Sequence, residues 1–244
     1  QDQGVVVLRV GPRGSVLTKT PVLPSIDNLV QRRWQVALEA SGDARVDEEL
    51  IIHGQAAPNW REHYQTEGER KDRYSRVWSG RFPGARLDTV AMPGIEDRNA
   101  PVTVRAGVTV PRLAHAAGGG GLDLPVTGRD ADFVRTYARL SARQQELVLG
   151  YPWQHDEELT YRLPSGWRLA AGAPPVRRVI DGPFGRFSLE VEIDGSVLRV
   201  RSSLNVTQAR ISADDYPRFR AFLLDVDAAL GSPIAVSPPS PVGS

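Results

Sequence analysis

The side chains best suited to chemistry in this chain are its four histidines, because the sequence contains no cysteine. The lack of thiols excludes disulfides, thiolate-ligated zinc, iron–sulfur clusters and cysteine nucleophiles. No HExxH pair or other ligand spacing links the histidines, which are His53, His63, His115 and His155. A metal or catalytic site would therefore require them to converge in the folded protein, and the sequence predicts neither a metal site nor a cofactor.

The run His155-Asp156-Glu157-Glu158 is the densest local group of potential ligands. It lies in a predicted strand, where neighbouring side chains point to opposite faces, so at most one nearby pair could reach a single ion. We interpret this run as an exposed strand entrance.

Other catalytic signatures are weak. No GxSxG elbow is present to support a serine nucleophile. Asp214 and Asp215 precede a predicted helix, where the helix dipole favours negative charge without any acid–base role. The glycine-rich run 116–121 is not followed by GK[ST] and predicts a flexible loop rather than a phosphate cradle. Two carboxylates brought together in space, as in glycosidases, remain an alternative.

Trp153 and Trp167 are the candidate binding residues. Exposed indoles can stack on sugar rings, so these two side chains would suit a carbohydrate-binding module.

Composition and charge exclude several kinds of partner. The 30 basic and 29 acidic residues are interspersed and give a net charge of +1, so nucleic acid is not an expected partner. No apolar run approaches the roughly 20 residues of a membrane span. Glycine and proline together number 42 residues, which favours many turns and short strands.

The chemistry-bearing residues fall on elements of a β-rich chain. The first half predicts a buried strand at 5–10, a proline-containing connector at 20–28, a hairpin around 33–39 and 44–52, a helix at 59–78, and strands at 86–90 and 102–110. The second half predicts strands at 146–149, 157–163 and 167–171, a hairpin of 185–193 with 197–207 around Asp194-Gly195, and an amphipathic helix at 212–230.

These elements indicate a mainly β, α+β fold of antiparallel β-sandwich-like units, each with one packed amphipathic helix. The expected organisation is a strand and connector from an upstream domain (1–28), a β-rich domain (29–115), a second β-sandwich-like domain (122–236) and a disordered tail (237–244). The boundary between the two domains would lie near the glycine-rich loop.

Three stretches resemble a known family: ELVLGYPWQHDEELTYRLPSGW (146–167), GPFGRFSLEVE (182–192) and ADDYPRFRAFLLDVDAAL (213–230). They are similar to the C-terminal β-rich, DUF3858-type region of bacterial transglutaminase-like proteins, in which a DUF3857 domain and a transglutaminase core come first. The first half also looks like the stretch that directly follows such a core, with GVVVLRV, TPVLPSIDN, a hairpin, a helix ending in GRFPGARLDTVAMPG and a VTV strand, so the resemblance covers nearly all of the chain. The family's catalytic Cys, His and Asp belong to that core, so the resemblance transfers no catalytic residue. It implies an exported protein, periplasmic or associated with the outer membrane.

Three functions follow as hypotheses. The first is a noncatalytic accessory region that binds its own upstream domain or another envelope protein. The second is a carbohydrate-binding module with a glycan as partner. The third is a hydrolase whose histidines and carboxylates assemble in space.

Overall fold

The computed structural model describes residues 3–12, 14–170 and 177–239. Most of the tail expected to be disordered, residues 240–244, lies outside this range, whereas Ser237 ends a strand. The strands are β1 Val6–Gly11, β2 Gly14–Lys19, β3 Leu29–Leu38, β4 Ala44–Ile52, β5 Arg86–Ala91, β6 Val102–Val110, β7 His115–Ala116, β8 Leu122–Leu124, β9 Leu147–Val148, β10 Trp153–Arg162, β11 Arg168–Leu169, β12 Arg177–Gly182, β13 Gly185–Asp194, β14 Val197–Val206, β15 Arg210–Ile211 and β16 Ile234–Ser237. The α-helices are α1 Ala57–His63, α2 Glu67–Arg81, α3 Phe133–Tyr137 and α4 Tyr216–Leu230.

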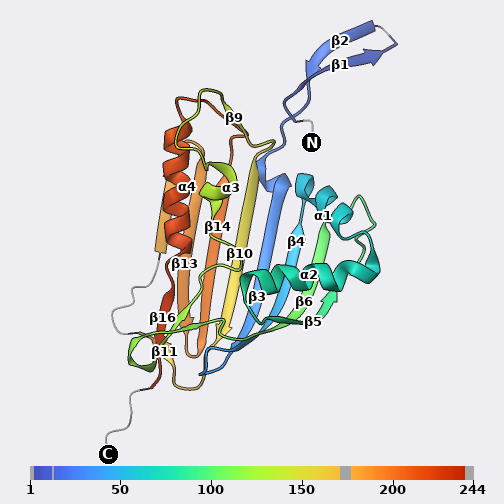
Figure 1. Ribbon diagram of the computed structural model, residues 1–244. Coiled ribbons are helices and arrows are strands. Elements are labelled where there is room, and N and C mark those ends of the chain that lie inside the picture. Colours follow the sequence, from blue (N-terminus) through green and yellow to red (C-terminus); the bar gives the residue numbers. More distant parts are fainter. Residues whose placement is uncertain (1–2, 13, 171–176, 240–244) are drawn as a thin grey trace, which may run out of the picture.

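One eight-stranded sheet organises the molecule, in the order β12-β13-β14-β10-β3-β4-β6-β5 (Figure 1). Strands β3 and β10 pair in parallel at its centre, and every other neighbouring pair in this sheet is antiparallel. The sheet is therefore two antiparallel four-stranded halves, β12-β13-β14-β10 and β3-β4-β6-β5, joined along one parallel seam. The β-rich, α+β class expected from the sequence is confirmed.

The sheet crosses the boundary expected near the glycine-rich loop. Strand β3 from the first expected unit pairs with β10 from the second over nine residue pairs, from Leu29 with Gln154 to Ala37 with Arg162. Buried residues of both halves also belong to one hydrophobic cluster. The two units thus share a sheet and a core, and the loop around 116–121 joins two parts of a single body.

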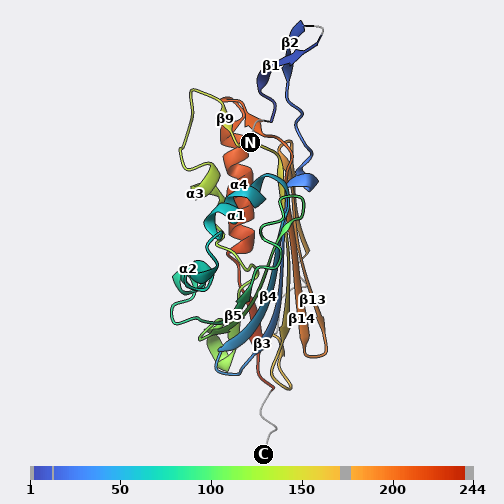
Figure 2. The ribbon, with the colours of Figure 1, turned by 90° about the vertical axis from the view of Figure 1, so that its right-hand side faces the viewer.

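The helices cover one face of the sheet and leave the other bare (Figure 2). Helix α2 packs near β5 and helix α4 near β12, so each half of the sheet carries one long helix. The short helices α1, which contacts β6, and α3, which contacts α4, add to the single helix that the sequence predicts for each half. The apolar stripe expected on α4 is fully buried and consists of Tyr216, Phe219, Leu223, Val226 and Leu230. Small sheets β11-β16-β8-β7 and β15-β9 complete the fold.

The single helix expected at 59–78 is two helices, α1 and α2. Tyr64 ends α1 in a non-helical conformation with φ −111° and ψ 21°, and Thr66 is extended before α2 begins. The Arg70 side chain donates to the carbonyl that the break frees on Tyr64, at 2.8 Å. Of the aromatic residues in this segment, Tyr64, Tyr74 and Trp78 are buried and Trp60 is half-buried.

The strand expected to be buried at 5–10 is exposed. Strands β1 and β2 form a two-stranded hairpin that projects beyond the end of the large sheet (Figure 1). Leu8 and Leu17 lie directly opposite one another in this hairpin and are 59% and 71% exposed. A run that is apolar apart from Arg9 predicts a strand correctly here, but it does not reveal what the strand packs against.

The bare face of the sheet carries a row of alternating charges. Seven residues on seven consecutive strands lie directly opposite one another, in the order Arg177, Glu190, Arg201, Glu158, Arg33, Glu49 and Arg105. Three neighbouring pairs approach closely: Arg201 Nε lies 3.3 Å from Glu158, and Glu49 lies 3.2 Å from Arg33 Nη1 and 3.3 Å from Arg105 Nε. Opposite charges facing each other across strands stabilise this register, and a shift of register would break the alternation.

Reversing the charge at the centre of this row should destabilise the sheet. In Glu158→Arg, three arginines would lie side by side on β14, β10 and β3, and we expect the free energy of unfolding to fall by about 1 kcal/mol at low salt. Added salt should reduce the difference by screening. Urea unfolding measures both effects. Glu62→Arg, the same reversal on an exposed position of α1, is the control, and an equal loss in both variants would contradict a role for the row.

Candidate functional site

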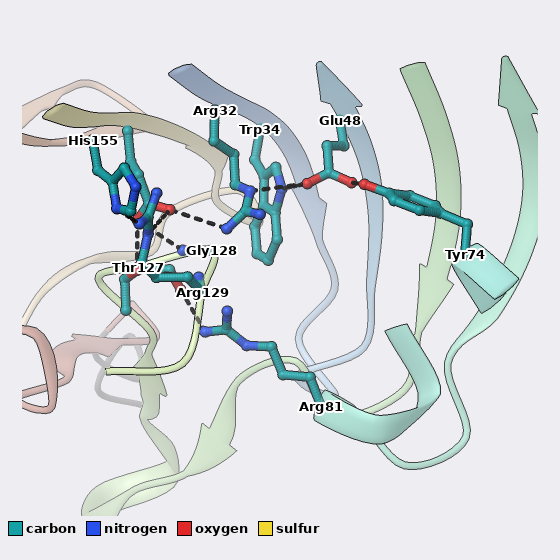
Figure 3. A network of polar contacts seen from close by, with 10 residues as sticks. Arg32, Trp34, Glu48, Tyr74, Arg81, Thr127, Gly128, Arg129 and His155 are labelled. Carbon is teal, nitrogen blue, oxygen red and sulfur yellow. Dashed lines mark hydrogen bonds and ion pairs between the residues drawn. The ribbon is translucent and has the colours of Figure 1, made fainter. Parts of the chain in front are cut away.

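The covered face of the sheet contains a buried network of charges at the parallel seam (Figure 3). Arg32 on β3 lies between two carboxylates: its Nε is 3.1 Å from Glu48 on β4, and its Nη1 is 3.1 Å from Glu157 on β10. Both glutamates are 5% exposed. One guanidinium therefore links the three central strands of the sheet.

Two aromatic side chains donate hydrogen bonds to the Glu48 carboxylate. Its Oε1 accepts from the Trp34 indole at 3.0 Å, and its Oε2 accepts from the Tyr74 hydroxyl at 2.6 Å. Trp34 lies opposite Glu48 on the neighbouring strand, whereas Tyr74 comes from helix α2. The carboxylate thus fastens α2 to the sheet.

The chain segment that connects the two halves of the sheet supplies further hydrogen-bond and ion-pair partners of Glu157. Its Oε1 lies 2.9 Å from Arg129 Nε, while its Oε2 accepts from the Thr127 hydroxyl and from the Gly128 backbone at 3.2 Å. The Tyr161 hydroxyl, also on β10, donates to Pro125 in the same segment at 2.7 Å. The connection is therefore held against the seam rather than passing over it freely.

Position 128 requires glycine because the backbone passes so close to the sheet. A Cβ there would lie 2.7 Å from the Arg32 side chain and 3.0 Å from the Trp34 ring. Contacts under 3.0 Å require a neighbour to move, and here the neighbours are the arginine at the centre of the network and a buried indole. The loop and the network fit only with no side chain at this position.

The charges keep each other ionised despite their burial. Burial alone would raise the pKa of Glu157, but Arg129 and Arg32 lower it to about 2. Burial would likewise lower the pKa of Arg32, yet Glu48 and Glu157 raise it above its ordinary value. The pKa of the Tyr74 hydroxyl is raised by burial and by Glu48, so it remains a donor.

His155 is the one candidate histidine that joins this network. Its Nδ1 contacts the Arg129 guanidinium, and its ring lies 4.5 Å from the Trp153 ring. Burial, then Arg129 and Arg32, hold the pKa of His155 well below its usual range. The imidazole is therefore neutral at physiological pH and accepts a proton only with difficulty.

This arrangement is suited to holding strands together rather than to catalysis. Both carboxylates have their oxygens engaged by donors, and a strongly ionised Glu157 is a poor general base. Among the described residues, no group of three or more histidine, aspartate or glutamate side chains could hold a metal ion. No helix in the same part of the chain is long and apolar enough to cross a membrane.

The two tryptophans proposed to bind sugar are buried. Trp153 is 4% exposed and stacks on Phe133 and Tyr137, with ring centroids 5.9 and 5.1 Å away. Trp167 is 9% exposed. Neither indole presents a free face for a sugar ring, so the exposed stacking platform expected at these positions is absent. Both belong to the hydrophobic core.

The remaining expectations about reactive groups have mixed outcomes. The run 155–158 is not an exposed strand entrance, because Glu157 is buried at the seam. The alternation predicted for this run is correct, since His155 and Glu157 share the covered face. His115 lies exposed on β7, in a different sheet from His155. Asp215 serves the start of α4, where its backbone N–H donates to the Ser212 hydroxyl at 3.0 Å.

Sequence reasoning missed Arg32, Glu48 and Arg129, although a signal for the first two existed. Glu48 has the same parity along its strand as Val46 and Leu50, and Arg32 the same as Trp34 and Val36. A charge at an apolar position of a strand indicates a buried charge that needs a partner. Arg129 lies in a loop, where no such parity exists.

Removing the charge of Glu157 should strongly destabilise the protein. Glu157→Gln leaves Arg32 and Arg129 buried with one counter-charge fewer, and we expect a loss of about 3–5 kcal/mol. Glu158→Gln is the matched control on the opposite face, where the ion pairs are exposed and the expected loss is under about 1 kcal/mol. Urea unfolding compares the two, and similar losses would contradict the buried network as the main stabilising contact.

His155 should make stability depend on pH in the mildly acidic range. Its folded-state pKa lies below the usual 6.5, so as pH falls through 6.5 the unfolded chain takes up the proton first and unfolding becomes more favourable. Between pH 7 and 5 this contributes up to about 1.4 kcal/mol per pH unit. His155→Gln should remove that part of the slope in unfolding measurements, whereas His115→Gln should keep it. An unchanged slope in His155→Gln would refute the assignment.

Known proteins resemble part of this chain. A family model described as a domain of unknown function with solved structure, DUF3858, matches residues 127–236, which confirms the expected similarity there. No curated protein matches the chain. A crystal structure described as a "putative protease" from Parabacteroides distasonis is similar at 14% identity and a TM-score of 0.41, over 50% of this chain and 24% of that one. This chain thus spans about a quarter of that protein's length. The DUF3858 match begins at Thr127, which binds Glu157, and includes the β10–β14 half of the sheet.

Proposed function

We propose that this chain is a noncatalytic accessory region of a larger bacterial envelope protein of the transglutaminase-like kind. Its role would be to bind and support the catalytic core of that protein. The proposal is supported by the DUF3858 match at 127–236 and by the lack of a cysteine nucleophile. It is also supported by the network at the seam, whose carboxylates and histidine are occupied in holding strands together.

The observation that carries the proposal is the exposed apolar face of hairpin β1–β2. Val6, Leu8 and Val10 share one face of β1 with Leu17 of β2, and all four side chains are more than half exposed. A two-stranded hairpin is at best marginally stable in water by itself. Apolar surface this concentrated marks an interaction site, and here the surface belongs to an extended two-stranded element that another sheet could accept.

The positive charge of the segment that contains hairpin β1–β2 favours a partner surface bordered by acidic residues. Between Gln3 and Ile26, the described part of the segment carries Arg9 and Lys19 and no acidic residue. Both basic side chains are exposed. The hairpin would therefore fit an apolar surface bordered by carboxylates on the catalytic core.

Binding of this chain to a separately expressed transglutaminase-like core of the same protein tests the proposal. Leu8→Lys combined with Leu17→Lys should abolish co-purification, because two charges would enter the apolar contact. The large sheet does not contact these side chains, so the melting temperature should stay within a few degrees of that of the parent chain.

Val77→Lys is the matched control, since Val77 is 53% exposed on α2, away from the hairpin. This variant should bind the core as the unmodified chain does. Failure of the unmodified chain to bind, or full binding by the double hairpin variant, would refute the proposed attachment.

A further inference from the structure

A hollow lies away from the seam, between the loop that follows α3 and the start of α4. It encloses about 400 Å³ and is lined by Arg135, Arg139, Arg143, Tyr137, Leu147 and Tyr216, among others. This volume falls within the range of small-molecule sites. Among the described residues that line it, three are arginines and none is acidic.

The acidic residues closest in sequence are already paired with arginines, one of which, Arg135, itself lines the hollow. Asp132 binds Arg135 at its Nε at 2.8 Å, and Glu146 binds Arg210 across the small β9–β15 sheet at 3.0 Å. Asp215 is 3.3 Å from Arg218 on α4. Each of these carboxylates therefore has a cation of its own.

Arg139 and Arg143 retain free donors. In the described part of the chain, Arg139 has no hydrogen-bond or ion-pair partner. Arg143 uses only its Nε, which donates to the Gln145 carbonyl at 3.2 Å, and its guanidinium lies over the Tyr216 ring at 5.6 Å. Two positive groups thus face one hollow with terminal nitrogens unused. Guanidinium groups bind carboxylate and phosphate oxygens in pairs of parallel hydrogen bonds.

Two tyrosines line the hollow beside the arginines. Tyr216 is completely buried at the first turn of α4, and its hydroxyl donates to the Leu140 carbonyl at 2.8 Å, which fixes the ring. The Tyr137 ring is held from behind by stacking on Trp153, 5.1 Å away. Arg143 covers the buried Tyr216 ring, so the ring that a ligand with a flat apolar part could contact is that of the half-buried Tyr137.

We propose that this hollow binds a small organic oxyanion, with Arg139 and Arg143 holding its carboxylate or phosphate group and Tyr137 contacting its apolar part. The site is separate from hairpin β1–β2, and it would stand even if the accessory role were wrong. It shares no residue with the ion-pair network at the seam.

Calorimetric titration of the full chain with phenyl phosphate, benzoate and inorganic phosphate tests the site. Phenyl phosphate and benzoate distinguish phosphate from carboxylate recognition, and inorganic phosphate shows what the aromatic wall contributes. We expect at least one aromatic anion to bind more tightly than inorganic phosphate, and binding to weaken as salt is added. Lack of measurable binding by all three probes would overturn the proposal.

Single substitutions test which residues bind the anion. Arg139→Gln should weaken binding of the preferred probe roughly tenfold or more, because it removes charge-assisted hydrogen bonds. Tyr137→Leu should weaken the aromatic probes and leave inorganic phosphate unchanged. Arg178→Gln, on the exposed edge strand β12, is the matched control and should bind within twofold of the parent chain.

Arg139 is exposed, so its substitution should leave the melting temperature unchanged, and this measurement separates lost binding from lost folding. Equal binding by Arg139→Gln and the parent chain would place the anion elsewhere and overturn the assignment.

Discussion

The position of Arg32 between Glu48 and Glu157 is the constraint on which the rest of the structure depends. The three residues come from β3, β4 and β10, so their mutual attraction acts across the one parallel pairing among the described strands of the large sheet. Taking three charges out of water costs several kcal/mol for each ion, and the cost is offset only when every charge is matched. The sheet, helix α2 and the connecting segment must therefore all be in place before the arrangement becomes favourable.

The two faces of the sheet use charge in opposite ways. On the bare face, solvent-exposed arginines and glutamates alternate across the strands. Each exposed ion pair contributes little to the free energy of unfolding, but the pattern specifies which residues lie opposite each other. On the covered face, a few charges are surrounded by Trp34, Tyr74 and Tyr161, where a missing partner is costly. Glu157 and Glu158 are neighbours in the chain, yet the pleat of one strand assigns them to these two different roles.

Much of the local structure could be predicted from sequence, and the long-range arrangement could not. Hairpin β13–β14 follows from alternating residues around Asp194-Gly195, and α4 from the spacing of its buried stripe. The β3–β10 seam leaves no local pattern, because its partners are far apart in sequence and parallel pairing requires no turn. The same limit applies to the site: strand parity marks Glu48 as unusual, but only the tertiary fold brings Arg32 and Arg129 to the carboxylates. The burial of Trp153 also depends on α3, an element that the sequence did not reveal.

The parallel seam also implies an order of events during folding. Each half of the sheet consists of strands from one part of the chain, so each half can begin to form while the other is still unstructured. The seam brings together Arg32 and Glu157, which are 125 residues apart, and closing so long a loop is slow. Correct pairing of β3 with β10 is the step that buries these charges together, and a sheet paired in another way would leave them without their partners.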